Sequence, residues 1–261
     1  MVRVDVNDSP TSSRAELLDV ARGLQARAAE NGLSLRLLGS LGVYHSCPTS
    51  RNLMADLGRG PTVDIDFIGA SKQSRKYQAL LSGMGYELHP DLIHSQEFGV
   101  SRLVFEGPPA LPKVDIFLDS LDMAHKIDLR SRIDLDPIAL TMTDLLLSKL
   151  QIHELTRNDL VDLCVLLAEP GPSQDAFDLN YLAKLMSNDW GFSYSALLNL
   201  AAVSESLVTF DQLSVADRET IAANAEAISV AIESEPKSMR WKMRAKMGAK
   251  VKWYEDVEEL R

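Results

Sequence analysis

The segment Val63-Asp64-Ile65-Asp66-Phe67-Ile68 alternates apolar residues with two aspartates, and its pattern indicates a β-strand. β-branched and aromatic residues favour strands, whereas aspartate is depleted in them. Side chains alternate across a strand, so Asp64 and Asp66 are expected on one face and their apolar neighbours on the other. Two like charges on one face repel each other unless a cation neutralises them. Because Mg²⁺ prefers carboxylate and phosphate oxygens, the segment predicts a magnesium-binding strand.

A solvent-facing edge strand with an acidic outer face would also explain Asp64 and Asp66, because a lone Asp-x-Asp is a frequent pattern. Two further segments favour the metal. Lys113-Val114-Asp115-Ile116-Phe117 is predicted to be a second apolar strand with a central aspartate, and three carboxylates on adjacent strands can hold two metal ions. Gly39-Ser40 is predicted at a strand-to-helix junction, where a glycine lets backbone amides approach a phosphate and the helix start offers unpaired N–H groups.

Strands and helices alternate as far as about residue 140, and only helices follow. In the first part, helices are predicted at 15–29 and 73–83, a helical start at 41–45, a loop at 47–61, and strands at 33–38, 63–68, 101–105 and 114–118. In the second part, helices are predicted at 143–153 behind a Thr143 cap, at 158–168 behind an Asn158 cap, and at 181–186, 194–204, 216–232 and 238–260. We therefore predict an α+β fold, in which a small mixed β-sheet flanked by helices (1–140) precedes a helical C-terminal domain (141–261) and the active site lies between them.

The composition is that of an ordinary folded protein, with 46% hydrophobic and 25% charged residues. No apolar run is long enough to cross a bilayer, and the polar stretch from Met1 to Ser13 does not resemble a signal peptide. The two cysteines, Cys47 and Cys164, are too few for a disulfide framework, so a cytoplasmic location is expected. A net charge of −10 argues against a protein whose whole surface binds nucleic acid.

The segment from Lys237 to Lys252 is strongly basic, since it carries +7 without any acid and leaves −17 for the rest of the chain. An apolar stripe at helical spacing is predicted to pack against the body, and consists of Met243, Met247, Val251 and Tyr254. A cationic row on another face consists of Lys242, Lys246 and Lys250, with Trp241 and Trp253 nearby. This row is expected to be solvated, to dock on the acidic body, or to bind a triphosphate or an RNA backbone.

The order of these motifs resembles the DNA polymerase β-like nucleotidyltransferase superfamily: a strand, Gly-Ser, a helix, Asp-x-Asp in a strand, and one aspartate in a later strand. The stretch from Thr143 to Leu163 is similar to the helical motif of the abortive-infection branch, which includes toxins of toxin–antitoxin pairs. The resemblance covers about residues 33–168. It implies transfer of a nucleotidyl group from a nucleoside triphosphate, such as ATP, to an acceptor hydroxyl, with release of pyrophosphate.

The resemblance also implies a role for each site residue. The residues concerned are Asp64, Asp66 and Asp115 for catalysis and Mg²⁺ binding, and Gly39, Ser40, Lys149 and Asp159 for the nucleoside triphosphate and its surroundings. Asp115 would also polarise the acceptor hydroxyl or accept its proton. Lys149 would neutralise phosphate charge, and Asp159 would be a polar group of the site.

The sequence departs from the family pattern at two places. The gap between Ser40 and Asp64 is longer than in compact members and is filled by the predicted loop 47–61, whose role the family does not explain. The family's arginine-lysine-aspartate pattern is here Arg157-Asn158-Asp159, which leaves the role of the arginine open. From the residues alone, Lys149 is a helix lysine that is solvated or ion-paired, and Arg157 and Asp159 are a capping and surface pair.

Three functions fit this sequence. The first is a toxin-like enzyme that modifies tRNA or another RNA end, with a cognate antitoxin as partner. The second is an enzyme that modifies a small molecule such as an aminoglycoside, for which an acidic cleft would attract the polycation. The third is a non-catalytic nucleotide-binding descendant, which has no reason to bear the repulsion among Asp64, Asp66 and Asp115. His94, between two predicted strands, is a further candidate for the acceptor site.

Overall fold

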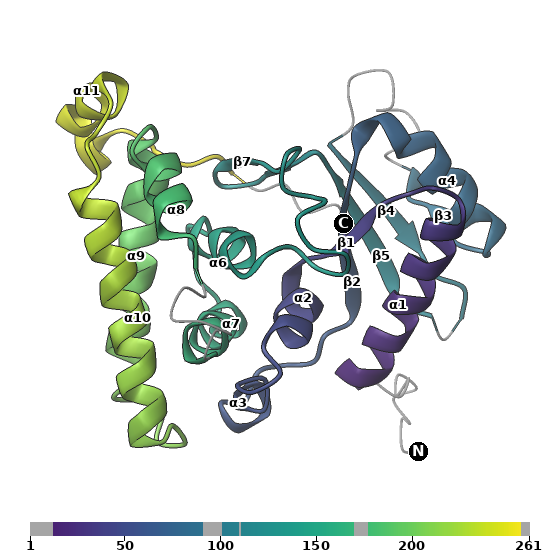
Figure 1. Cartoon of the computed structure of the whole chain (residues 1–261), viewed down its shortest axis with the longest axis horizontal. Coiled ribbons are helices and arrows are strands. Elements are labelled where there is room, and N and C mark those ends of the chain that lie inside the picture. The colour runs from purple at the N-terminus through teal and green to yellow at the C-terminus, as the bar shows by residue number, and fades with distance from the viewer. Residues whose placement is uncertain (1–12, 91–100, 110, 170–176, 257–261) are drawn as a thin grey trace, which may run out of the picture.

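The computed structural model describes residues 13–90, 101–109, 111–169 and 177–256, and a five-stranded mixed sheet lies in its first half (Figure 1). The strand order is β1 (Leu35–Leu37), β2 (Asp64–Gly69), β5 (Lys113–Leu118), β4 (Arg102–Glu106) and β3 (Glu87–Leu88). β2 and β5 run parallel, and the other neighbouring pairs are antiparallel. The predicted small mixed sheet is confirmed.

Side chains alternate along β2, so the two faces of the strand pack against two different layers of the molecule. Ile65 and Phe67 are fully buried on the face that α1 (Arg14–Glu30) and α4 (Ser74–Gly83) cover (Figure 1). Ile68 belongs to a separate apolar cluster that includes Val43 of α2 (Gly39–Ser46). Because residues of one parity share a face, Asp64 and Asp66 lie on the face away from α1 and α4.

The chain after residue 140 is helical, as predicted. Its helices are α6 (Met142–Leu150), α7 (Arg157–Ala168), α8 (Leu179–Met186), α9 (Trp190–Ser206), α10 (Val215–Ser234) and α11 (Met239–Met247). α11 lies at the end of the molecule away from the sheet (Figure 1). One apolar core joins α6 to α10 and also takes in Ile68 and Phe117 of the sheet. A division into separate domains at residue 140 stays a prediction.

Two predicted helix caps are wrong by two residues. α6 is capped by Thr141, whose hydroxyl accepts a hydrogen bond from the backbone N–H of Asp144. α7 is capped by Thr156, which forms a reciprocal capping box with Asp159. Thr143 and Asn158 lie inside the helices. The error has a physical origin, since several polar residues near a helix start carry the same capping signal.

The C-terminal helix is shorter than predicted. α11 ends where Gly248 takes a positive φ of 57°, and a 3₁₀ turn, η3 (Gly248–Lys250), follows. Lys250 therefore lies outside the helix that carries Lys242 and Lys246, and the predicted row of three lysines is interrupted.

The packed face of α11 also differs from the prediction. Met243 and Met247 are 60% and 47% exposed, whereas Trp241 and Arg244 are partly buried. The Arg244 guanidinium lies over the ring of Trp190 and donates to three backbone carbonyls of the segment after α11. These contacts hold the Arg244 side of the helix inward, so of the predicted stripe Met243, Met247 and Val251 stay exposed, whereas Tyr254 packs by stacking on His153.

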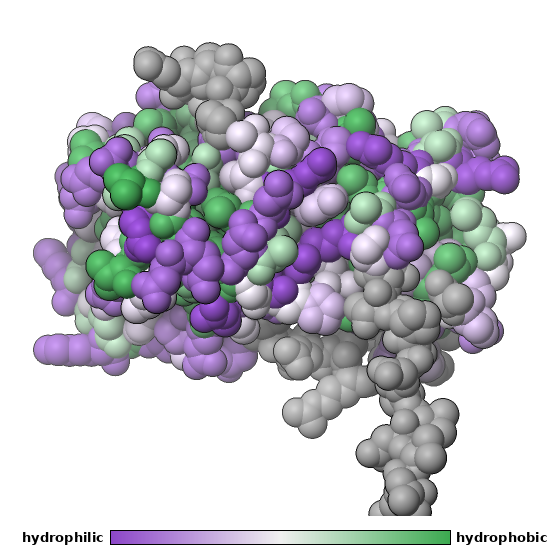
Figure 2. Space-filling model, turned by 90° about the horizontal axis from the view of Figure 1, so that it is seen from below, coloured by the Kyte–Doolittle hydropathy of each residue, from purple (hydrophilic) through white to green (hydrophobic). Residues whose placement is uncertain are grey.

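Five short elements were not predicted: α3 (Leu53–Asp56) inside the expected loop 47–61, η1 (Ser71–Gln73), the edge strand β3, and the hairpin strands β6 (Ser120–Asp122) and β7 (Lys126–Asp128). Each is too short for a periodic signal. On the face in Figure 2, hydrophilic residues predominate and hydrophobic ones are scattered between them. In the described part of the chain, no helix is both long and apolar enough to cross a membrane.

Candidate active site

Three aspartates converge where β2 and β5 begin. The parallel register places Asp66 directly beside Asp115, and Asp64 lies two residues earlier on β2. One carboxylate oxygen of each lies within 4.8 Å of the others. Asp115 is fully buried, and Asp64 and Asp66 are partly exposed. The structure thus brings together the three acids that the sequence singled out.

The cluster has the chemistry of a divalent-cation site. Three carboxylates at this spacing are a donor set that suits a hard cation such as Mg²⁺. Asp115 Oδ1 is buried and has no hydrogen-bond partner among the described residues, so it is available to a ligand. Within the described ranges, no other three His, Cys, Asp or Glu side chains converge in this way.

Charge compensation is uneven across the cluster. Asp115 forms an ion pair with Arg102 through Oδ2, and Lys113 Nζ lies 3.8 Å from Oδ1. Asp66 has no such ion pair with a described residue. Burial, together with the negative charges of Asp64 and Asp115, raises the pKa of Asp66 to about 7. Asp66 is therefore the carboxylate that stands to gain most from a bound cation.

Position 39 requires a glycine because its backbone lies very close to the aspartate cluster. Its φ is +62°, and a Cβ at this position would lie 2.2 Å from Asp66 Oδ2. A backbone hydrogen bond joins the same two segments, because the N–H of Leu38, the residue before Gly39, donates to the Asp66 carbonyl at 3.1 Å. Among the described residues no side chain caps the first turn of α2, so its N–H groups lack a side-chain acceptor beside the aspartates.

Ser40 is buried in a hydroxyl pair with Thr62, whose Oγ1 lies 2.7 Å from Ser40 Oγ. Thr62 Oγ1 also accepts hydrogen bonds from Arg14 Nε and Arg59 Nη1, each at 3.3 Å. An oxygen that accepts two bonds must use its own proton for the third. Thr62 therefore donates to Ser40, and the Ser40 hydroxyl proton is available to another acceptor.

Lys149 lies in a buried ion-pair network. Its Nζ is 2.9 Å from Asp159 Oδ1 and 2.9 Å from Asp162 Oδ2. Arg59 pairs with both oxygens of Asp162, which is fully buried. Lys149 is also close enough to Asp66 to lower its pKa. The Lys149 ammonium is thus already paired, and Asp159 serves both that pair and the cap of α7.

Sequence reasoning missed three charged residues that complete these contacts. Arg102 reaches Asp115 from β4, one strand farther along the sheet, and only the register reveals this. Arg59 comes from the segment predicted as a loop. Asp162 had a usable signal, because an acid among the apolar residues of a helix indicates a buried partner.

The remaining candidates lie elsewhere. Cys47 and Cys164 are free and buried, and burial raises the pKa of the Cys164 thiol to about 11. His125 is buried with Nε2 2.9 Å from Ser195 Oγ. His94 lies outside the described residues.

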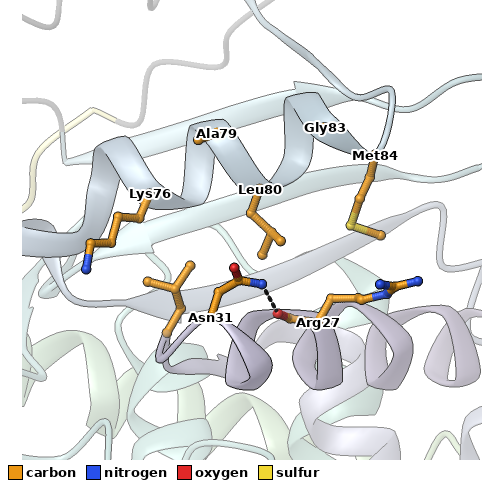
Figure 3. A pocket seen from close by; sticks show the side chains of 8 residues that line it. Arg27, Asn31, Lys76, Ala79, Leu80, Gly83 and Met84 are labelled. Atoms are coloured by element: carbon orange, nitrogen blue, oxygen red, sulfur yellow. Dashed lines mark hydrogen bonds between the residues drawn. The ribbon is translucent and has the colours of Figure 1, made fainter.

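A depression of about 640 Å³ lies between α1 and α4, on the sheet face opposite the aspartates (Figure 3). Arg27 and Lys76 border it, and Leu80 and Met84 point toward its centre. Asn31 in its wall donates a hydrogen bond to the Arg27 carbonyl. Its lining contains no acid, so it offers no alternative cation site.

Comparison with known proteins gave little. No protein-family model matches the chain, and no curated protein matches it. Among solved structures, the chain is similar to the solution structure of the antibiotic-resistance factor ANT(2'')-Ia, at 11% sequence identity and a TM-score of 0.35. The similarity covers 84% of this chain and 96% of that one. At this level it assigns neither substrate nor reaction, so the function must come from the aspartate cluster itself.

Proposed function

We propose that this chain is a Mg²⁺-dependent nucleotidyltransferase that moves a nucleotidyl group from a nucleoside triphosphate to an acceptor hydroxyl. The observation that carries the proposal is the convergence of Asp64, Asp66 and Asp115 beside the uncapped start of α2. Carboxylates alone would repel a triphosphate. A carboxylate cluster next to a helix start suits a nucleotide that arrives with its cation.

Asp64, Asp66 and Asp115 would hold the metal, which when bound would stabilise the negative charge that develops on the transferred phosphate. Arg102 occupies Asp115 Oδ2 and leaves Oδ1 to the cation and to the proton of the acceptor hydroxyl. In the proposed reaction the acceptor oxygen bonds to the α-phosphorus and passes its proton to Asp115. The bond to the β-phosphate breaks, and pyrophosphate leaves with the electron pair.

The phosphates would lie against the first turn of α2. The N–H groups of this turn and the Ser40 hydroxyl, which Thr62 leaves free to donate, point to an anion-binding role. Gly39 lets the helix start approach Asp66 without a side chain between them. Lys149 contributes positive charge from behind the cluster, with Asp159 fixing its position.

Two acceptor classes are candidates. An RNA end would make the chain a toxin-like enzyme with an antitoxin partner, as the motif resemblance implies. A small cationic acceptor such as an aminoglycoside is favoured by the net charge of −10. The basic helix α11 lies away from β2 (Figure 1), so it does not lead an RNA strand to the aspartates.

The test is transfer of label from each nucleoside triphosphate, with Mg²⁺, to total RNA or to a panel of aminoglycosides. We expect label transfer that depends on Mg²⁺ and falls by about 100-fold or more in Asp64→Asn and Asp66→Asn. Asp122→Asn, on the exposed hairpin, is the matched control and should retain activity. Full activity in a folded Asp64→Asn or Asp66→Asn variant would refute the metal role.

A further inference from the structure

Two exposed surfaces of opposite charge play no part in the proposed reaction. The first is the outer face of α11, which we call the α11 face. Its exposed members are Met239, Lys242, Met243, Lys246 and Met247. Neither lysine forms an ion pair with a described residue. The face is therefore both cationic and apolar.

Three other cations of the same segment have structural partners. Lys237 Nζ donates to backbone carbonyls at the end of α10, and Arg244 holds the segment after α11. Lys252 Nζ lies 2.6 Å from Asp256 Oδ2. The lysines and methionines of the α11 face have no comparable contact. Unpaired cations beside exposed methionines are typical of a surface that binds a partner.

The second surface is a groove of about 490 Å³ between α9 and α10, which we call the acidic groove. Its charged members are Glu205, Glu226 and Glu233, which are exposed and form no ion pair with a described residue. Its apolar members are Leu197, Leu200, Ala201 and Ala225. None of the described residues that line the groove is a cation. It is therefore acidic and apolar, the complement of the α11 face.

The two surfaces also match in size. The nine residues of α11 span about 13 Å, and the groove extends over nine residues of each helix, or about the same length. Small residues let a helix come close to the groove. Ser204 and Ser229 add to this, because each hydroxyl already donates to a carbonyl of its own helix.

The groove of the same chain is out of reach for the α11 face. Arg244 lies over the ring of Trp190, the first residue of α9, and keeps the inner side of α11 on that end of the bundle. Met243 and Met247 border a depression beside Trp190, but they and the two lysines of the α11 face remain exposed. For the α11 face to occupy such a groove, the groove must belong to another molecule.

We propose that the α11 face docks into the acidic groove of a second copy of this chain. Lys242 and Lys246 then lie beside the groove glutamates, and Met243 and its neighbours cover the apolar floor. Formed reciprocally, the contact closes into a dimer with two equivalent interfaces. An RNA backbone would pair with the lysines, but it would leave the methionines and the groove without partners. Neither surface includes the aspartate cluster, so this proposal is independent of the proposed function.

The experiment measures the mass of the full chain in solution over a range of concentrations by sedimentation. We expect the mass to rise from 28.8 kDa toward twice that value at about 0.05 M salt, and to fall back at about 1 M salt because the Debye length shrinks to about 3 Å. Lys242→Glu/Lys246→Glu and Glu205→Lys/Glu226→Lys should each weaken self-association by about tenfold or more. Lys72→Glu/Lys76→Glu is the matched control, since it reverses two exposed lysines at the same spacing, and should associate like the unaltered chain.

Mixing the two charge-reversed variants gives the decisive result. Each variant alone has two surfaces of like charge, whereas the mixture restores opposite charges across the contact. We expect the mixture to recover the dimer mass. A single-chain mass at all concentrations, association that ignores the reversals, or a mixture that stays monomeric overturns the proposal. So does loss of binding to labelled RNA in Lys242→Glu/Lys246→Glu without self-association of the unaltered chain, which would make the α11 face a nucleic-acid surface.

Discussion

Asp66 and Asp115 are neighbours in register, yet their surroundings make them chemically different. Asp115 is paired with Arg102, whereas Asp66 has no ion pair with a described residue. Asp66 lies beside two other carboxylates and is largely shielded from solvent, and both effects raise its pKa to about 7. The charge of the cluster near neutral pH is therefore decided largely at Asp66, and this residue should dominate its response to pH.

The first prediction is a pH dependence of stability in the absence of divalent metal. A raised carboxyl pKa means that the native state holds a proton that the unfolded state releases, so the free energy of unfolding falls as pH rises from about 4 to about 7. One pKa unit corresponds to about 1.4 kcal/mol, so the fall is at most about 4 kcal/mol, and partial exposure reduces it.

Asp66→Asn should remove this part of the pH dependence and be more stable than the unaltered chain at pH 8. Urea denaturation at several pH values, followed by circular dichroism, measures the difference between the two proteins. Asp122→Asn on the exposed hairpin serves as the control. Parallel pH profiles for the unaltered chain and Asp66→Asn would contradict the raised pKa.

The second prediction concerns Mg²⁺. Protons and Mg²⁺ compete for the same carboxylates, so Mg²⁺ should raise the melting temperature more at pH 8 than at pH 6. A shift of several degrees is expected at saturating metal, and thermal unfolding with and without Mg²⁺ measures it. Asp66→Asn should lose most of the shift. An equal shift in Asp66→Asn would place the bound ion elsewhere.

The third prediction compares the same substitution at two glycines. Gly39→Ala places a methyl group against Asp66 and strains a backbone with φ of +62°, so we expect a loss of about 1–3 kcal/mol and of Mg²⁺ binding. Gly23→Ala lies inside α1 with open space around it and should stabilise the chain by about 0.5–1 kcal/mol. Urea denaturation distinguishes the two. Stability of Gly39→Ala equal to that of the unaltered chain would exclude the close approach to Asp66.

At the scale of elements, a buried charge network ties α6 and α7 to the segment before β2. Asp162 on α7 joins Lys149 on α6 to Arg59, and Asn158 on α7 accepts a hydrogen bond from the Gly60 N–H at 2.8 Å. The segment that contains Arg59 and Gly60 leads directly into Asp64 on β2. The helices after residue 140 thus help to position the first aspartate of the site.

The fourth prediction tests this network. Asp162→Ala leaves Arg59 and Lys149 without their shared carboxylate in a buried place, so it should cost about 3–5 kcal/mol of stability. Asp128→Ala breaks an exposed ion pair with Arg130 and should cost far less, because solvent screens that pair. Chemical denaturation of both variants gives the comparison. A small effect of Asp162→Ala would mean that the network does not hold α7 to the sheet half.

At the scale of the whole molecule, one apolar core crosses the sequence boundary at residue 140. Ile68 and Phe117 of the sheet belong to the same cluster as Leu145 of α6 and Leu200 of α9. Side chains that share one core become exposed to solvent together when that core unfolds. The two halves should therefore unfold as one cooperative unit.

The fifth prediction follows from the position of the tryptophans. Trp190, Trp241 and Trp253 all lie after residue 140, so tryptophan fluorescence reports only on the helical half, whereas far-ultraviolet circular dichroism reports on the whole chain. The two urea transitions should coincide. Separate midpoints would show two independently folding domains, as the sequence boundary suggested.

The sequence by itself determined the features that depend on neighbours along the chain. Alternation along a strand put Asp64 and Asp66 on one face, and the change of pattern near residue 140 separated the sheet from the helices. Helical spacing also revealed two faces on α11. These signals are local, because the periods of strands and helices are fixed by backbone geometry.

Only the tertiary structure decided what depends on contacts between distant segments. The register of β2 against β5 set Asp66 beside Asp115, and β4 supplied Arg102. Both stripes of α11 have helical spacing, but the methionines and lysines of the helix are exposed, and it is Arg244, outside both stripes, that packs on Trp190. Register and docking are fixed by burial and charge pairing between residues far apart in sequence, and no local pattern encodes those pairings.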